Sequence, residues 1–180
     1  MITTAVKRLT FEEFEQMPDQ PGKQELLDGE LIELPPAKSR HNRIARRIYH
    51  RLQAIVTELH ARNEAPQLGE VCLEMGYRLK SHGWLQPDVS IAHAGQQETD
   101  YLLESPALAV EVISNEKIAD HIDKKIKLYL DNGAFEVWVL YPNQRHMWIY
   151  KSGPIGELHS GSFPSELLGG QTIDLAEILK

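Results

Sequence analysis

The fold is decided by one stretch near the middle of the chain, Ala107-Leu108-Ala109-Val110-Glu111-Val112-Ile113. It is a nearly continuous apolar run, which is typical of a strand buried on both faces of a sheet. Glu111 is the only charged residue inside it. Because an unpaired carboxylate in such a strand would lose its hydration, Glu111 must be neutralised, hydrogen-bonded or bound to a cation. The stretch therefore predicts both a central strand and a candidate functional residue.

The elements around this strand predict a mixed sheet with helices packed on it. From residue 39 onward we expect, in order, a helix at 39–60, strands at 71–79, 88–92 and 107–113, a helix at 117–131, a strand at 135–141 and its hairpin partner at 146–150. Apolar residues at helical spacing indicate the two helices, and alternation of apolar with other residues indicates the strand at 71–79. This αβββαβ order favours an α/β (α+β) domain with a mixed central sheet flanked by helices.

The first 36 residues predict an extension made of a short helix and a hairpin. Thr10 and Glu13 have the spacing of a capping box, so a helix is expected to begin there and to end near Met17-Pro18. The hairpin is expected over 24–34, with Asp28-Gly29 as its two-residue turn. The tail from about residue 153 is rich in turn residues and receives no assignment. We expect one domain over residues 1–180, with its core at about 39–150.

Composition narrows the class of protein. The chain has 180 residues, of which 42% are hydrophobic and 25% charged, as in ordinary globular domains. Its net charge of −7 excludes a globally basic nucleic-acid-coating protein. Cys72 is the only cysteine, so neither an intrachain disulfide nor a thiolate zinc site is expected. The sequence shows neither a signal peptide nor a long apolar span, and we expect a cytoplasmic protein without membrane association.

A second carboxylate begins the strand that comes before Glu111 in the chain. Asp88 follows Pro87 at the start of that strand, where its side chain could meet Glu111 if the two strands pair. Oxygen ligands from neighbouring strands suit a hard cation such as Mg²⁺. The spacing alone is equally compatible with a structural ion pair at Glu111 and a solvated turn residue at Asp88. Lys125, near the edge of the buried face of the following helix, could reach both carboxylates, or could simply be solvated.

Several segments, taken in order, resemble one family. Gln86-Pro87-Asp88 and Val110-Glu111-Val112-Ile113 resemble the PD-(D/E)xK nuclease superfamily, and the flanking segments resemble its restriction-endonuclease-like branch, once classified as a domain of unknown function. The flanking segments are Glu25-Leu26-Leu27-Asp28-Gly29-Glu30-Leu31-Ile32, Ser39-Arg40-His41-Asn42-Arg43-Ile44, Lys125-Ile126-Lys127-Leu128-Tyr129 and Phe135-Glu136-Val137-Trp138-Val139. The resemblance covers roughly residues 10–150 and implies a restriction-endonuclease-like fold.

The resemblance also implies a metal-dependent phosphodiesterase, an endonuclease acting on DNA. Asp88, Glu111 and the carbonyl of Val112 would hold Mg²⁺ or Mn²⁺, and a lysine would stabilise developing negative charge. The sequence departs from the family pattern because Ile113 stands where the superfamily's lysine is usual. Lys125 on the next helix is the matching position in this branch, and Lys124 is the second choice. Glu25 and His41 are lesser candidates: Glu25 as a third acidic ligand or an ordinary hairpin charge, His41 as a site residue or a core histidine.

A basic segment predicts where nucleic acid would bind. Six bases and no acid occur between Lys38 and Thr57, so the segment carries +6 and the rest of the chain −13. The arginines that could contact phosphates are Arg40, Arg43, Arg46 and Arg47. The same helix could instead pair with acids of this chain or of a second copy, and a homodimer is expected because nucleases that cut both strands often work as symmetric pairs. The competing interpretation of the whole chain is a catalytically silent interaction or nucleic-acid-binding protein on the nuclease scaffold.

Overall fold

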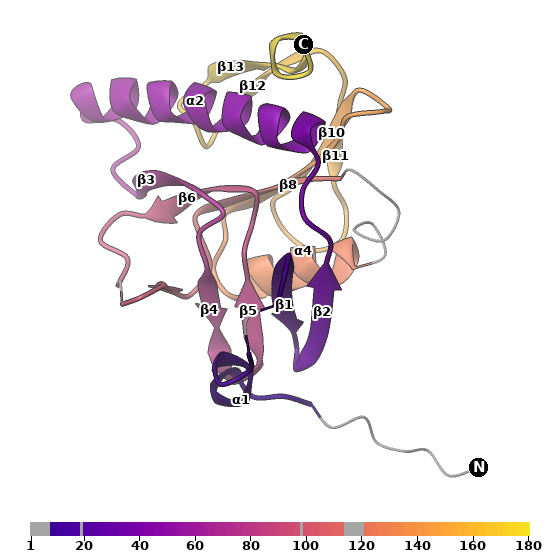
Figure 1. Ribbon diagram of the computed structural model, residues 1–180. Coiled ribbons are helices and arrows are strands. Elements are labelled where there is room, and N and C mark those ends of the chain that lie inside the picture. Colours follow the sequence, from indigo (N-terminus) through magenta and orange to yellow (C-terminus); the bar gives the residue numbers. More distant parts are fainter. Residues whose placement is uncertain (1–7, 19, 98, 114–120) are drawn as a thin grey trace.

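The computed structural model describes residues 8–18, 20–97, 99–113 and 121–180 (Figure 1). Its main sheet has six strands in the order β11-β10-β9-β8-β6-β3. The strands are β3 (Leu68–Leu73), β6 (Val89–His93), β8 (Leu108–Val112), β9 (Glu136–Tyr141), β10 (His146–Tyr150) and β11 (Glu157–His159). β8 pairs parallel with β9 and antiparallel with β6. All five residues of β8 are buried, which confirms the predicted central strand.

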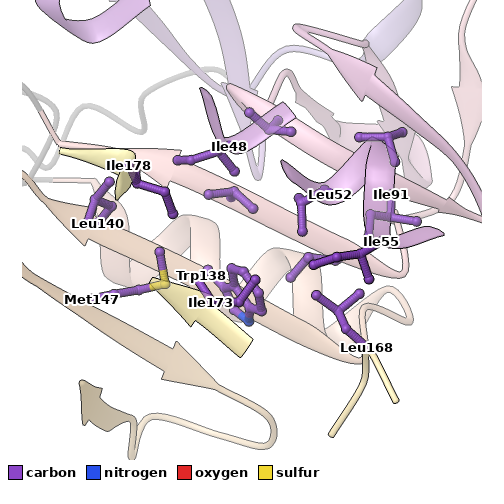
Figure 2. Packing of buried hydrophobic residues seen from close by; sticks show 14 of the residues in the cluster. Ile48, Leu52, Ile55, Ile91, Trp138, Leu140, Met147, Leu168, Ile173 and Ile178 are labelled. Atoms are coloured by element: carbon purple, nitrogen blue, oxygen red, sulfur yellow. The ribbon is translucent and has the colours of Figure 1, made fainter. Parts of the chain in front are cut away.

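Helices cover both faces of this sheet. Helix α2 (Ser39–Ala61) lies across one face, and α4 (Ile122–Asp131) lies on the other (Figure 1). Ile48, Leu52 and Ile55 of α2 point at the sheet and pack in one cluster with Trp138 and Ile91 (Figure 2). Burying an aliphatic side chain of this size stabilises the fold by about 1.5–3 kcal/mol. Together with β3, β6, β8 and β9 the two helices form the predicted αβββαβ core.

The C-terminal segment, which the sequence did not assign, packs beside α2 on the same side of the main sheet. It forms β12 (Ser162–Ser165), β13 (Gln171–Asp174) and the short helix α5 (Leu175–Ile178). β12 and β13 pair with each other in a separate two-stranded sheet. Leu168, Ile173 and Ile178 belong to the same apolar cluster as α2 (Figure 2). The tail is therefore part of the main core.

A second sheet contains the N-terminal hairpin and brings it close to Asp88. It has the order β2-β1-β5-β4-β7, formed by β1 (Lys23–Leu27), β2 (Glu30–Leu34), β4 (Tyr77–Leu79), β5 (Gly83–Leu85) and β7 (Leu102–Leu103). The predicted turn is confirmed, because Asp28 and Gly29 have φ of 51° and 83°. β1 pairs with β5 at Leu26 and Trp84. Because Asp88 follows β5 closely, this pairing carries the N-terminal hairpin to the start of β6.

Helix α1 (Phe11–Glu15) begins at the predicted capping box. The Thr10 side chain accepts from the Glu13 N–H, and the Glu13 side chain accepts from the Thr10 N–H. Both bonds satisfy N–H groups that the first turn of a helix leaves without partners. The 3₁₀ turn η1 (Lys80–His82) joins β4 to β5. Within the residues that the structure describes, no helix is long and apolar enough to cross a membrane.

The prediction of one strand over 71–79 is wrong. The chain leaves β3 at Leu73, bends at Glu74 with φ of 47°, and enters β4 of the other sheet at Tyr77. At Gly76 an added Cβ would lie 2.1 Å from the Trp84 ring, so the bend depends on a residue without a side chain. The apolar alternation continues across the bend although the strand does not. Leu73, expected to face the core, is 41% exposed.

Smaller differences concern the ends of elements. Asp88 precedes β6 rather than beginning it, the hairpin starts at Lys23 instead of residue 24, and β9 begins at Glu136. Helix α4 begins at Ile122, and the first part of the helix predicted over 117–131 lies outside the described residues.

Candidate active site

Asp88 and Glu111 come together because β6 and β8 pair. Val89 is opposite Val110 in the antiparallel register, and one step further along each strand brings Asp88 opposite Glu111. Both side chains are buried, with relative exposures of 6% and 2%. Two carboxylates at the end of a strand pair, in the middle of the main sheet, need compensating positive charge or hydrogen bonds.

The Asp88 carboxylate is held by three groups from different elements. Its Oδ2 accepts a hydrogen bond of 2.7 Å from the Val112 N–H. Its Oδ1 lies 3.1 Å from Nε2 of His41 and 3.5 Å from Nζ of Lys23. Burial by itself would raise the pKa of Asp88, but Lys23, His41 and the Val112 N–H lower it well below its ordinary value. Asp88 is therefore a carboxylate anion at neutral pH.

Glu111 is compensated less completely than Asp88. Its Oε1 lies 2.6 Å from Nζ of Lys125 and accepts a hydrogen bond of 2.8 Å from the Tyr129 hydroxyl. Lys125 and Tyr129 both come from α4, one turn apart, and both are buried. Burial raises the pKa of Glu111 even though Lys125 and Lys23 oppose the shift. A further cation near this carboxylate would therefore be favourable.

Glu25 is the third buried carboxylate, supplied by β1 of the second sheet. Its Oε1 lies 2.9 Å from Nζ of Lys125 and accepts from the Gln86 N–H at 3.2 Å. Burial would raise the pKa of Glu25, but Lys125 and Lys23 lower it. Lys125 therefore lies between Glu25 and Glu111 and joins the two sheets through its ammonium group. Of the two interpretations of Glu25, a third acidic ligand or an ordinary hairpin charge, its burial at 1% exposure and its contact with Lys125 favour the first.

Lys23 was not identified from the sequence. It lies two residues before Glu25 on β1, on the same side of the strand, and its Nζ is 3.6 Å from Glu25 Oε1 and 3.5 Å from Asp88 Oδ1. The carboxylates of Asp88 and Glu25 raise its pKa in spite of burial. The available signal was the alternation Lys23-Gln24-Glu25, which puts both charged side chains on one face if the strand begins one residue earlier than predicted.

A cleft of about 430 Å³ opens onto this cluster. Lys23, His41, Asp88 and Glu111 line it, together with the turn that joins β2 to α2. A larger hollow of about 750 Å³ lies beside the hairpin turn and the outer face of α4. Three of the cations that line it pair with exposed acids, in the contacts Arg8–Asp28, Lys124–Glu30 and Lys127–Asp131. The smaller cleft is the candidate active site because it alone of the two reaches the buried carboxylates.

Some predicted site residues lie away from the cleft. The Lys124 ammonium pairs with exposed Glu30 of β2 at 2.6 Å, and among the described contacts none joins it to Asp88 or Glu111. Arg40 donates to Asn143 Oδ1 at 2.7 Å, and Arg47 donates to the carbonyls of Ile178 and Lys180. These two arginines bind other parts of this chain. Arg43 and Arg46 are exposed.

The cluster offers carboxylate oxygens, which suit a hard divalent cation, but they are not already arranged around one metal position. In the described part of the chain, no three acidic, histidine or cysteine side chains converge closely enough to hold a metal directly. A cation nevertheless already lies between two of the carboxylates, the Lys23 ammonium at about 3.5 Å from each. Three buried carboxylates against the two ammonium groups of Lys23 and Lys125 leave one negative charge for His41 or a metal to balance. Carboxylate oxygens are the ligands that Mg²⁺ and Mn²⁺ prefer.

Comparisons with known proteins agree with this architecture. Residues 11–180 match the Uma2 family, described as "Putative restriction endonuclease". A crystal structure described as "a putative nuclease belonging to DUF820 from Anabaena variabilis ATCC 29413" superposes with a TM-score of 0.76 at 16% sequence identity, covering 95% of this chain and 97% of the other. None of the curated proteins matches the sequence. The fold is therefore restriction-endonuclease-like, and the chain belongs to the Uma2 family.

Proposed function

We propose that the protein is a metal-dependent endonuclease that hydrolyses phosphodiester bonds of DNA. The observation that carries the proposal is a cluster of three buried carboxylates, Glu25, Asp88 and Glu111, joined by a buried lysine. Two of the three, Asp88 and Glu111, line the cleft. Burying three acids together costs stability. Clusters of this kind are typical of functional sites, where the chemistry requires the acids. Membership of the Uma2 family, whose description is "Putative restriction endonuclease", supports the same reaction class.

Asp88 and Glu111 would hold Mg²⁺ or Mn²⁺, with Glu25 and the Val112 carbonyl as further oxygen donors. When bound, such a metal supplies a Lewis acid at the scissile phosphate and an activated water. The chain's own residues fix the carboxylates: the Val112 N–H and His41 orient Asp88, and the Tyr129 hydroxyl orients Glu111. Groups of this kind, which fix the ligands, tune metal sites strongly.

Lys125 is the proposed catalytic lysine, in place of the residue at position 113. Its ammonium group lies 2.6 Å from Glu111 and 2.9 Å from Glu25, at the back of the carboxylate cluster. From there it would orient the two carboxylates and stabilise negative charge that develops at the phosphate. Ile113, at the position usual for the superfamily's lysine, is buried in the apolar cluster on the α4 side of the sheet and offers no such charge.

Arg43 and Arg46 are the proposed contacts to the DNA backbone. Asn42 of α2 lines the cleft, and Arg46 lies one helical turn beyond it on the same face. Both arginines are exposed, and phosphate contacts need only accessible positive charge. A homodimer is part of the proposal because nucleases that cut both strands often work as symmetric pairs.

Cleavage of supercoiled plasmid, linear DNA and RNA with Mg²⁺ or Mn²⁺ tests the function. Wild type should cut DNA only with metal, and Asp88→Asn and Glu111→Gln should each lose at least about 100-fold in rate. Glu136→Gln is the matched control, because Glu136 is a buried carboxylate on β9 that pairs with Trp138 instead of lining the cleft. Metal binding by calorimetry without cutting of any substrate would instead support a catalytically silent binding protein.

A further inference from the structure

Lys23 lies between Asp88 and Glu25, two of the carboxylates that are proposed to supply oxygen donors to the metal. Its ammonium group is 3.5 Å from Asp88 and 3.6 Å from Glu25. These separations are longer than the 2.6 Å and 2.9 Å that Lys125 makes to Glu111 and Glu25. Two lysines therefore pair with one carboxylate cluster: Lys125 at short distances and Lys23 at longer ones.

The two lysines also differ in their access to solvent. The Lys125 side chain is 2% exposed and lies at the back of the cluster, whereas that of Lys23 is 18% exposed and lines the cleft. The Lys23 backbone is fixed in β1 by its pairing with Leu34 of β2, so only the side chain is free to move. Its four-carbon stem has enough rotatable bonds to carry the charge from the carboxylates into the cleft.

A lysine and a divalent cation cannot share this position. Like charges a few ångströms apart in a partly buried site repel by several kcal/mol at an effective dielectric constant near 20. Metal entry between Asp88 and Glu25 would therefore require the Lys23 ammonium to leave. The only open direction described for it is the cleft, where a phosphodiester would lie under the proposed function.

We propose that Lys23 is a positioning residue, an internal counter-cation that holds Asp88 and Glu25 in place without metal and is displaced into the cleft when a divalent cation binds. The inference rests on the proposed metal site and adds a competition between the chain's own cation and the metal. It predicts that wild type binds metal more weakly than the same carboxylates would bind it without the Lys23 ammonium. Removing the ammonium group should therefore tighten metal binding, whereas removing an ordinary supporting residue would weaken it.

The test is calorimetric titration of Mn²⁺ and Mg²⁺ into the full chain. We compare wild type with Lys23→Met, which keeps the stem, with Lys23→Arg, which keeps the charge, and with Lys127→Met, which removes an exposed lysine paired with Asp131 outside the cleft. Lys23→Met should lower the metal Kd at least about tenfold, the size of a typical coupling between two binding events. Lys23→Arg should bind metal no more tightly than wild type, and Lys127→Met should match wild type.

Each result separates the inference from the proposed function. If wild type and Lys23→Met bind metal equally well, the competition is wrong and the metal site stands. If neither binds metal, both the site and the inference fail. Should Lys23→Met not fold, the ammonium NMR signal of Lys23 in the wild-type protein decides. A protected signal that is lost as Mg²⁺ binds supports displacement, and a signal unchanged at saturating Mg²⁺ overturns it.

Discussion

The Lys125 ammonium lies 2.6 Å from the Glu111 carboxylate, with both side chains 2% exposed, and so joins α4 to the central strand of the main sheet. The same ammonium lies 2.9 Å from Glu25 on the second sheet. One buried cation thus ties together three elements that are far apart in the sequence. Because breaking a buried pair leaves an uncompensated charge, this residue should matter for stability as well as for chemistry.

Lys125→Met should destabilise the metal-free protein by about 3–5 kcal/mol, because Glu25 and Glu111 would be left buried with too little positive charge. Urea unfolding in the presence of a chelator measures the loss. Added Mn²⁺ should restore part of it by supplying positive charge to the same carboxylates. Lys127→Met on the exposed face of α4 is the control and should change stability by less than about 0.5 kcal/mol. An equal loss in both variants would show that Lys125 does not compensate the cluster.

Tyr129→Phe should separate orientation of Glu111 from simple packing. The variant removes the hydroxyl that donates to Glu111, so we expect a stability loss of about 1–3 kcal/mol and metal binding at least about tenfold weaker. Tyr77→Phe is the matched control, because the Tyr77 hydroxyl is also buried and donates to Ser90 Oγ at 2.8 Å, but Tyr77 does not line the cleft. It should lose stability and keep metal affinity. Unfolding and calorimetric titration of both variants give the comparison, and unchanged metal affinity in Tyr129→Phe would contradict the orienting role.

Features that depend on neighbouring residues in the chain were predicted correctly. The capping box at Thr10 and the turn at Asp28-Gly29 are local, because the residues themselves supply the required hydrogen bonds and backbone angles. The central strand at Glu111 follows from an apolar run that only a two-sided burial explains. The place of Lys125 at the inward edge of its helix indicates that it could reach the carboxylates, and the structure has its ammonium group beside Glu25 and Glu111.

Features that depend on contacts distant in sequence were missed. The chain bends at Glu74, and the Trp84 ring of the neighbouring strand leaves no room for a side chain at Gly76. Because the alternation of apolar residues continues through the bend, the sequence alone predicts one strand. Lys23 falls just before the predicted hairpin and was not singled out, because the pairing of β1 with β5 that carries it to Asp88 joins segments distant in the sequence. The tail packs its hairpin beside α2 and against Trp138 of β9, contacts with no local signal.

Glu136→Gln should make stability less dependent on pH. Glu136 is buried on β9, where its Oε2 accepts from Trp138 Nε1 at 2.7 Å, and burial raises its pKa. A raised carboxyl pKa means that the ionised form costs stability above the folded pKa and that the cost disappears as pH falls below the unfolded pKa of about 4.3. Since glutamine can still accept the bond, the variant should be more stable than wild type at pH 7–8, with the difference shrinking toward pH 4. Thermal unfolding across this pH range measures the difference in stability between the variant and wild type. Glu64→Gln, at an exposed glutamate, is the control. A gain in stability that is equal at pH 4 and pH 8 would point to packing instead of ionisation.

The arginines of α2 should divide into two groups with opposite consequences. Arg47 and Arg51 donate to carbonyls of the C-terminal segment, so replacing both with Ala should cost about 1–3 kcal/mol of stability and leave DNA affinity unchanged. Arg43→Ala with Arg46→Ala should leave stability nearly unchanged and weaken DNA binding on every sequence. If each of these two arginines neutralises one phosphate, the slope of log K against log salt concentration should fall by about 1.8 for duplex DNA.

Fluorescence anisotropy over a salt series, with Ca²⁺ in place of Mg²⁺, measures the slope without a requirement for cutting. A slope that falls equally in both double variants would place the DNA along the whole helix, and a slope unchanged in the Arg43 and Arg46 variant would remove α2 from the DNA-binding surface.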